Sequence, residues 1–135
     1  MKVMLEKYGI MPTRAHADDA GLDLYSPLDC WVYKGGQKLI DTGVHVDIPR
    51  GYVGLITSKS GLMSLGITTR GTIDCGYTGT IKAVVYNDSS ESYRIAKGQK
   101  ITQLVLVPCL IPELELVDQF EETDRGENGF GSSGL

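Results

Sequence analysis

The last twelve residues, 124–135, combine groups that suit an anionic ligand; they read DRGENGFGSSGL. Four of them are glycines, whose backbone can curl successive N–H groups into a concavity that binds anions. Ser132 and Ser133 add hydroxyl donors, and Arg125 supplies a planar charged fork that matches a phosphate. Phe130 can stack on a flat partner such as a nucleobase. The segment therefore indicates a flap that binds a nucleotide.

A frayed C-terminus is the alternative interpretation of the same segment. Beyond Pro112 the chain is acidic and then rich in glycine. After Phe120 it offers too little apolar surface to fold by itself, and chain ends are where order is commonly lost. The residues from Gly126 to Ser133 also match the spacing of a P-loop, but Ser132 replaces its lysine, so a P-loop NTPase is excluded.

Composition predicts one globular domain of 135 residues, with 41% apolar and 22% charged residues. The net charge of −4 argues against a nucleic-acid partner, which usually meets a basic surface. Cys30, Cys75 and Cys109 are too few and too scattered for a disulfide framework, which fits a reducing compartment. His16 and His45 are solitary, so we expect no zinc site built from protein ligands.

The chain also lacks the apolar segments that a membrane would need. Glu6 and Lys7 interrupt the N-terminus, where a signal peptide requires an apolar run. The longest apolar run, residues 104–107, ends at Pro108 and is too short to span a bilayer. We expect a protein of the cytoplasm with no membrane partner.

The elements that would position these groups are mainly short strands. Val44, Val46 and Ile48 alternate with polar residues, as do the apolar residues of 81–85, and this period of two is typical of half-buried strands. Glycine-rich and Asn/Ser-rich turns separate the strands. Only residues 59–66 indicate a helical turn. Many short strands predict an all-β sandwich or barrel, jelly roll included.

Five stretches, read in order, resemble the five motifs of the homotrimeric dUTPase family. They are ADDAGLDLYS (17–26), SKSGLMSLGI (58–67), GTIDCGYTGTIKAVVYN (71–87), KGQKITQLVLVP (97–108) and DRGENGFGSSG (124–134). The resemblance covers nearly the whole chain. It implies a distorted jelly-roll subunit of the β-clip type over residues 1–118. Residues 119–135 would form an arm that closes over a neighbouring subunit's site in a homotrimer.

The activity that this resemblance implies is hydrolysis of dUTP to dUMP and pyrophosphate with Mg²⁺. By the same resemblance, Asp74 would deprotonate the water that attacks the α-phosphorus. Tyr77 would pack under the deoxyribose and leave no room for a 2′-hydroxyl. Main-chain groups between the strands would pair with the edge of uracil, which excludes cytosine because buried groups would be left unpaired. These groups belong to Gly71, Thr72, Ile73 and Lys82.

The first and second stretches would hold the metal and the phosphates. Asp23 matches the family carboxylate that binds Mg²⁺ through water, and Mg²⁺ readily keeps its waters. The family usually has Arg-Ser-Gly in the second stretch, where this chain has Lys59, Ser60 and Gly61. Lysine keeps the charge but loses the bidentate fork.

Two further residues and the arm complete the implied substrate site. Thr68 stands where the family more often has an asparagine that contacts the base, and Gln103 matches a glutamine on the phosphate side. Gln99 and Lys100 replace the usual Asp-Arg pair. In the arm, the phenyl ring would cover uracil and the other groups would hold the γ-phosphate; these residues are Arg125, Phe130, Gly131, Ser132 and Ser133.

Two alternatives stay open at the level of sequence. The related dCTP deaminases share the fold, and a bifunctional form would also release dUMP. Such an enzyme needs a further acid/base carboxylate at the pyrimidine, and none stands out near Asp74. The second alternative is a trimer that binds nucleotide, or regulates, without turnover; the departures at Lys59 and Thr68 are what favour it.

Overall fold

The computed structural model of the chain describes residues 1–129, which form ten β-strands and one helical turn. This confirms the all-β prediction and the helical turn expected after Lys59. The elements are β1 (Val3–Leu5), β2 (Gly21–Tyr25), β3 (Cys30–Val32), β4 (Gln37–Asp41), β5 (Val44–Val46), β6 (Tyr52–Thr57), α1 (Ser60–Met63), β7 (Ile67–Ile73), β8 (Lys82–Asn87), β9 (Tyr93–Ile95) and β10 (Lys100–Pro108).

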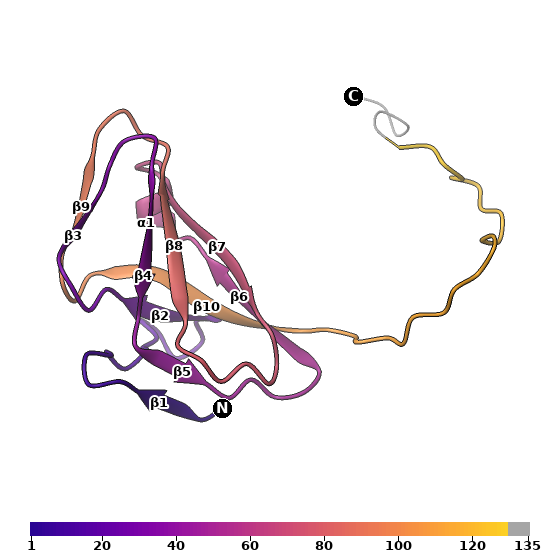
Figure 1. Ribbon diagram of the computed structural model, residues 1–135, viewed down its shortest axis with the longest axis horizontal. Helices are drawn as coiled ribbons and strands as arrows, with labels where there is room; N and C mark the ends of the chain where they lie inside the picture. The colour runs from indigo at the N-terminus through magenta and orange to yellow at the C-terminus, as the bar shows by residue number, and fades with distance from the viewer. Residues whose placement is uncertain (130–135) are drawn as a thin grey trace.

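One curled sheet organises the body. Its six strands follow the order β2-β10-β6-β7-β8-β4, and every neighbouring pair is antiparallel. Two small ribbons complete the fold: β1 pairs with β5, and β3 pairs with β9. In Figure 1 these ribbons lie at opposite ends of the curled sheet. The chain therefore has the partly rolled β architecture that a jelly roll implies.

The core is built by the alternation that the sequence shows. Val44, Val46 and Ile48 are all buried while His45 between them is only partly so, which confirms the predicted inward face. The buried aliphatic residues fall into two clusters, and burial of each Val, Leu or Ile side chain stabilises the fold by about 1.5–3 kcal/mol. One cluster contains Val32, Ile40, Leu62, Ile67, Ala83, Val85, Ile95 and Ile101. The other contains Leu24, Val44, Val46, Ile48, Ile56, Ile81 and Leu104.

The apolar run at residues 104–107 lies in β10, in the interior of the sheet between β2 and β6. Leu104 is fully buried, but the three residues that follow it are only half-buried. The expectation that both faces of this strand are covered is thus met only in part by a single chain.

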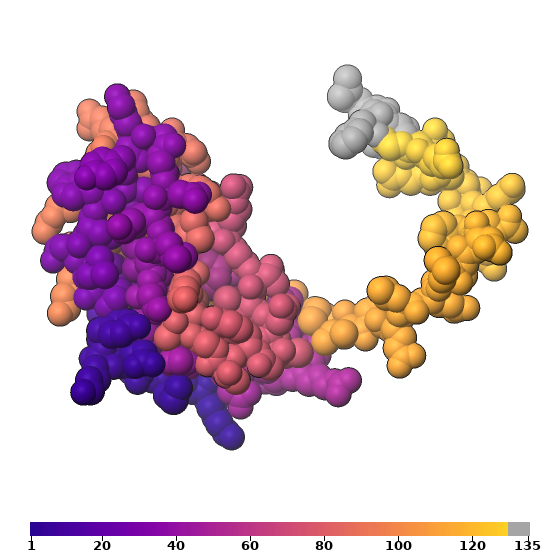
Figure 2. All heavy atoms as spheres, in the orientation of Figure 1, coloured from indigo at the N-terminus to yellow at the C-terminus, as the bar shows by residue number. Residues whose placement is uncertain are grey.

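Residues 109–129 leave the body as an extended segment without helix or strand (Figures 1 and 2). Its apolar side chains are exposed: Leu110 by 93%, Leu114 by 97%, Leu116 by 99% and Phe120 by 90%. Such a row of uncovered apolar groups is unusual on a protein that works alone. The expected boundary between body and arm, at residues 118 and 119, stays a prediction. In the part of the chain described here, no helix has the length and apolar character to cross a membrane.

Candidate active site

The turn between β7 and β8 forms one side of a cavity of about 240 Å³. Its lining consists of Thr72, Ile73, Asp74, Tyr77, Thr80 and Lys82. The resemblance described above implies that all of these residues except Thr80 belong to the nucleoside site. The structure therefore brings that part of the prediction together in one place.

Local bonding shapes this turn. The Tyr77 backbone N–H donates to the Asp74 carbonyl at 3.2 Å, and the Tyr77 hydroxyl donates to the Thr80 carbonyl at 3.0 Å. Gly79 is required beside the ring, because a Cβ there would lie 2.6 Å from Tyr77 Cζ. The turn thus presents the aromatic ring in a fixed position between the two strands.

Asp74 follows the last residue of β7 directly and is exposed at the cavity. Within residues 1–129, no donor pairs with its carboxylate oxygens. A carboxylate that faces a water-accessible cavity, with its lone pairs unoccupied, can accept a proton from a bound water. Its position suits the role of a general base.

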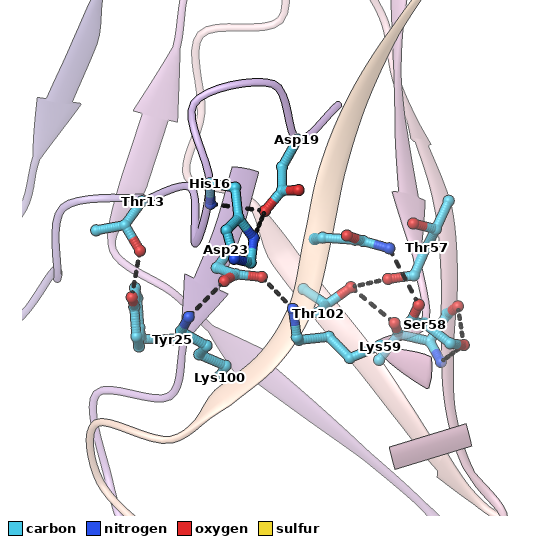
Figure 3. A network of polar contacts seen from close by, with 12 residues as sticks. Thr13, His16, Asp19, Asp23, Tyr25, Thr57, Ser58, Lys59, Lys100 and Thr102 are labelled. Atoms are coloured by element: carbon cyan, nitrogen blue, oxygen red, sulfur yellow. Dashed lines mark hydrogen bonds and ion pairs between the residues drawn. The ribbon is translucent and has the colours of Figure 1, made fainter. Parts of the chain in front are cut away.

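A second polar cluster surrounds Asp23 on β2 (Figure 3). Asp23 is only 3% exposed, and each of its carboxylate oxygens meets a lysine: Oδ1 pairs with Lys59 Nζ, and Oδ2 lies 2.7 Å from Lys100 Nζ. Gln103 lies opposite Asp23 in the β10–β2 register, and its amide donates to the Ser58 carbonyl at 3.3 Å. The predicted metal and phosphate residues are therefore neighbours.

The lysines keep Asp23 charged. Burial by itself would raise the pKa of Asp23, but hydrogen bonds from Lys100 and Lys59, with the charges of both lysines, outweigh it and hold the pKa below its ordinary value. In return, the hydrogen bond to Asp23 raises the pKa of Lys100. The cluster is one buried carboxylate between two cations, so a positive charge remains for an anionic ligand.

Replacing this carboxylate gives the first test of the cluster. We expect Asp23→Asn to lower the free energy of unfolding at pH 7 by about 2 kcal/mol, because charged hydrogen bonds to two lysines are lost. A depressed pKa in the fold contributes stability above the unfolded value that disappears as the pH falls through the folded value. The wild-type stability should therefore fall more steeply below about pH 4 than that of the variant. Urea titrations across pH measure both, and parallel curves would contradict the expectation.

The remaining second-stretch residues lie beside this cluster. Lys59 precedes α1 at its N-cap position, and both Ser60 and Gly61 are exposed on that helical turn. No neighbouring atom lies within 4 Å of a Cβ built on Gly61, so the backbone is open to a ligand. Thr68 lies elsewhere, on β7 opposite Tyr86 of β8.

The two clusters lie at opposite ends of the β6–β7 pair. Ile73 beside the cavity pairs with Gly54 at the start of β6, whereas Lys59 follows the end of β6 at Thr57. Lys59 follows Gly54 by five positions, which corresponds to about 16 Å along an extended strand. Within one chain, the cavity and the Asp23 cluster are therefore separate regions along β6.

Arg125 is not brought to either cluster in this structure. Arg125 Nε donates to the Asn128 carbonyl at 3.1 Å, in the arm that extends away from the body (Figure 1). Phe130, Gly131, Ser132 and Ser133 lie outside the described residues. The residues that the prediction missed are Thr80 and Lys100. The sequence does hold a signal for Lys100, because Gln99-Lys100 stands where the family usually has an Asp-Arg pair.

Comparison with known proteins identifies the fold and the activity. A model of the dUTPase family matches residues 7–134. The chain belongs to the dUTPase family. The deoxyuridine 5′-triphosphate nucleotidohydrolase of Clostridium novyi (strain NT) is 42% identical over 142 residues, with 100% of both chains covered. The protein is accordingly a dUTP diphosphatase, and the predicted family and enzyme class are confirmed.

Solved dUTPase structures share the fold. A mutant dUTPase of Staphylococcus bacteriophage 80alpha, solved with dUpNHpp, superposes with a TM-score of 0.91 at 38% identity, covering 99% of this chain and 98% of that one. A mutant dUTPase from phage phi11 of S. aureus, in which a structural Mg(II) ion is coordinated, gives 0.82 at 33% identity, covering 90% and 98%. The predicted dUTPase jelly roll is confirmed.

Mg²⁺ fits the Asp23 cluster through water rather than by direct protein ligation. In residues 1–129, no group of three or more His, Cys, Asp or Glu side chains could hold a metal ion. Asp23 is a single ionised carboxylate with about four lone-pair positions, of which the lysines occupy two. It can therefore accept a hydrogen bond from a metal-bound water, as the prediction requires.

Proposed function

We propose that this dUTPase hydrolyses dUTP to dUMP and pyrophosphate by an Asp74-activated water that attacks the α-phosphorus. The observation that carries the proposal is the cavity where Asp74 and Tyr77 face the same space between β7 and β8. Asp74 lines that cavity beside Tyr77 and is exposed. In the proposed role it acts as a general base, for which a carboxylate needs only hydrogen-bond reach to the attacking water.

The step balances without another reactant. The water oxygen forms a bond to the α-phosphorus while the bond from that phosphorus to the α,β-bridging oxygen breaks. The water proton moves to the Asp74 carboxylate, and the electron pair of the broken bond leaves with pyrophosphate. Asp74 returns its proton to solvent after the products depart.

The same turn between β7 and β8 selects deoxyuridine. Backbone groups of Gly71, Thr72, Ile73 and Lys82 pair with the edge of uracil, and an amino group in place of its carbonyl would leave buried groups unpaired. Such a mismatch can lower kcat/KM by about 10⁴-fold. Tyr77 closes the sugar side, where its ring leaves no space for a 2′-hydroxyl.

The Asp23 cluster serves the phosphates. Lys59, Ser60 and Gly61 surround the start of α1 and hold the α- and β-phosphates by charge and hydrogen bonds. Gln103 adds an amide donor from β10, and Thr68 contacts the base side. When bound, Mg²⁺ screens the phosphate charge and orients the triphosphate, and Asp23 holds one of its waters.

We further propose that the working form is a homotrimer with sites shared between copies. The separation of the two clusters along β6 supports this, because a neighbouring copy can bring its phosphate cluster to the cavity of the first chain. The exposed apolar residues that follow β10, Leu110, Leu114, Leu116 and Phe120, give a second reason, because a neighbouring copy can cover them. The arm, residues 119–135, brings Arg125, Phe130 and residues 131–133 to that shared site.

We place the reaction in the cytoplasm, with dUTP rather than nucleic acid as the partner. Cys30, Cys75 and Cys109 are all free thiols. Free thiols fit a reducing compartment. The net charge of −4 also argues against a polynucleotide partner, which usually meets a basic surface.

A substrate panel tests this function most directly. We expect pyrophosphate release from dUTP with Mg²⁺, and rates at least about 10³-fold lower with UTP, dTTP or dCTP, because each mismatches the cavity. Each nucleotide is assayed with Mg²⁺ and with excess chelator. Ammonia release from dCTP would favour the deaminase alternative, and binding of dUTP without turnover would favour a non-catalytic trimer.

A further inference from the structure

His45 ties the substrate turn to the rest of the body. Its Nδ1 lies 2.7 Å from the Thr78 carbonyl oxygen, and its Nε2 lies 3.3 Å from Glu6 Oε1. The side chain is 15% exposed. On β5 its neighbours Val44 and Val46 turn into the core, so alternation directs His45 to the opposite face, toward the turn.

A second hydrogen bond also holds the turn, and we call it and the His45–Thr78 contact the two tethers. Thr80 Oγ1 donates to Asp41 Oδ2 at 2.9 Å, and Asp41 Oδ1 accepts from the Gly43 N–H at 2.9 Å. Asp41 is the last residue of β4 and His45 lies within β5, so the two tethers hold the turn from two consecutive strands. The carbonyl of Thr80 also receives the Tyr77 hydroxyl. The ring that shapes the cavity therefore has its position set by a turn that is fastened at Thr78 and Thr80.

We propose that His45 is a positioning residue for dUTP binding, which holds the Thr78 carbonyl so that Tyr77 and Asp74 keep their places around the cavity. This rests on the proposed role of the turn as the deoxyuridine site. His45 does not touch the reacting atoms; it acts through the shape of the turn. Its loss should therefore weaken nucleoside binding more than it slows the chemical step.

The chemistry of its partners favours a histidine here. Carboxylate and carbonyl oxygens are both acceptors, so only an imidazolium, which carries two N–H donors, satisfies both. The hydrogen bond to Thr78 raises the pKa of His45, partial burial opposes this, and the Glu6 carboxylate raises it again. Asp41 adds a negative charge nearby, while Lys2 and Asp47 line the adjoining surface hollow.

Three variants of the full-length protein test the proposal. We expect His45→Ala to raise the Kd for dUMP and the KM for dUTP about fivefold, as loss of one hydrogen bond implies, with kcat within about twofold. His45→Asn places an amide N–H near the former Nδ1 and should restore most of the affinity. Asp47→Ala changes a neighbouring exposed side chain and serves as the matched control. Calorimetric titration with dUMP and steady-state rates with dUTP give the values.

Hydrogen exchange separates this idea from the proposed function. In the protein without nucleotide, His45→Ala should speed exchange of the Tyr77 amide, which donates to the Asp74 carbonyl, whereas the control and the Asn variant leave it unchanged. Unaltered exchange and unaltered dUMP affinity in the Ala variant would overturn the proposal, as would equal losses in the Ala and Asn variants. If the wild-type protein binds no dUMP, the proposed function fails, and the exchange data still decide whether His45 holds the turn.

Discussion

Asp74→Asn should reduce pyrophosphate release from dUTP by about 10³-fold, the range that a general base contributes. The amide keeps the shape of the carboxylate but cannot take a proton from water. Because Asp74 is exposed and lies outside both core clusters, the melting temperature should stay unchanged. Single-turnover rates, measured at saturating dUTP and Mg²⁺, report the chemical step.

The matched control for this variant is Asp88→Asn, which makes the same change at an exposed turn residue after β8. We expect it to retain wild-type rates. Affinity for an unhydrolysable dUTP analogue should remain within about threefold for both variants, since only the activation of water is lost. Equal turnover by wild-type protein and Asp74→Asn would defeat the catalytic assignment.

Removal of residues 125–135 should lower turnover by about 10²-fold or more. A closing segment excludes bulk water, strengthens the remaining polar contacts and fixes the phosphates. The body does not depend on this segment, because its last strand, β10, ends at Pro108 and the arm extends away from it (Figure 2). Sedimentation should therefore show the same assembly state as the full-length protein, and thermal unfolding an unchanged midpoint.

A chain that lacks only Leu135 is the control for this truncation, since that residue has no predicted role in the site.

Mixed trimers then test whether the arm crosses between copies. Subunits with Asp74→Asn are combined with truncated subunits, each of which is expected to have strongly reduced turnover by itself. Partial recovery of turnover is expected, because an intact arm can close over an intact Asp74 of another copy. Undiminished turnover by the truncated protein alone would end the flap hypothesis.

Much of the fold was readable from local patterns. The alternation of Val44, Val46 and Ile48 with polar residues predicts a buried face, because successive side chains in a strand point to opposite sides. The closely spaced Asp74 and Tyr77 could be placed together since a short turn keeps neighbours in sequence near in space. The alternation of apolar residues does not distinguish a β-sandwich from a β-barrel. Resemblance to the dUTPase motifs then supplied the jelly-roll architecture.

Other features depend on pairing between distant segments, about which a local pattern says nothing. Lys100 meets Asp23 because β10 pairs with β2 in one particular register, and a shift by one residue would turn it to the other face. His45 reaches Thr78 only because β5 passes beside the turn. The placement of the two clusters at opposite ends of β6 follows from the β6–β7 register, which composition and spacing do not encode.

Under the proposed sharing of sites between copies, that placement along β6 makes the activity of the protein depend on its concentration. The nucleoside cavity of one copy and the phosphate cluster of another then serve the same nucleotide. Specific activity should therefore fall as the protein is diluted below the dissociation constant of its assembly, and dUTP, by bridging copies, should oppose that loss through mass action. The substrate would then stabilise the assembly that hydrolyses it.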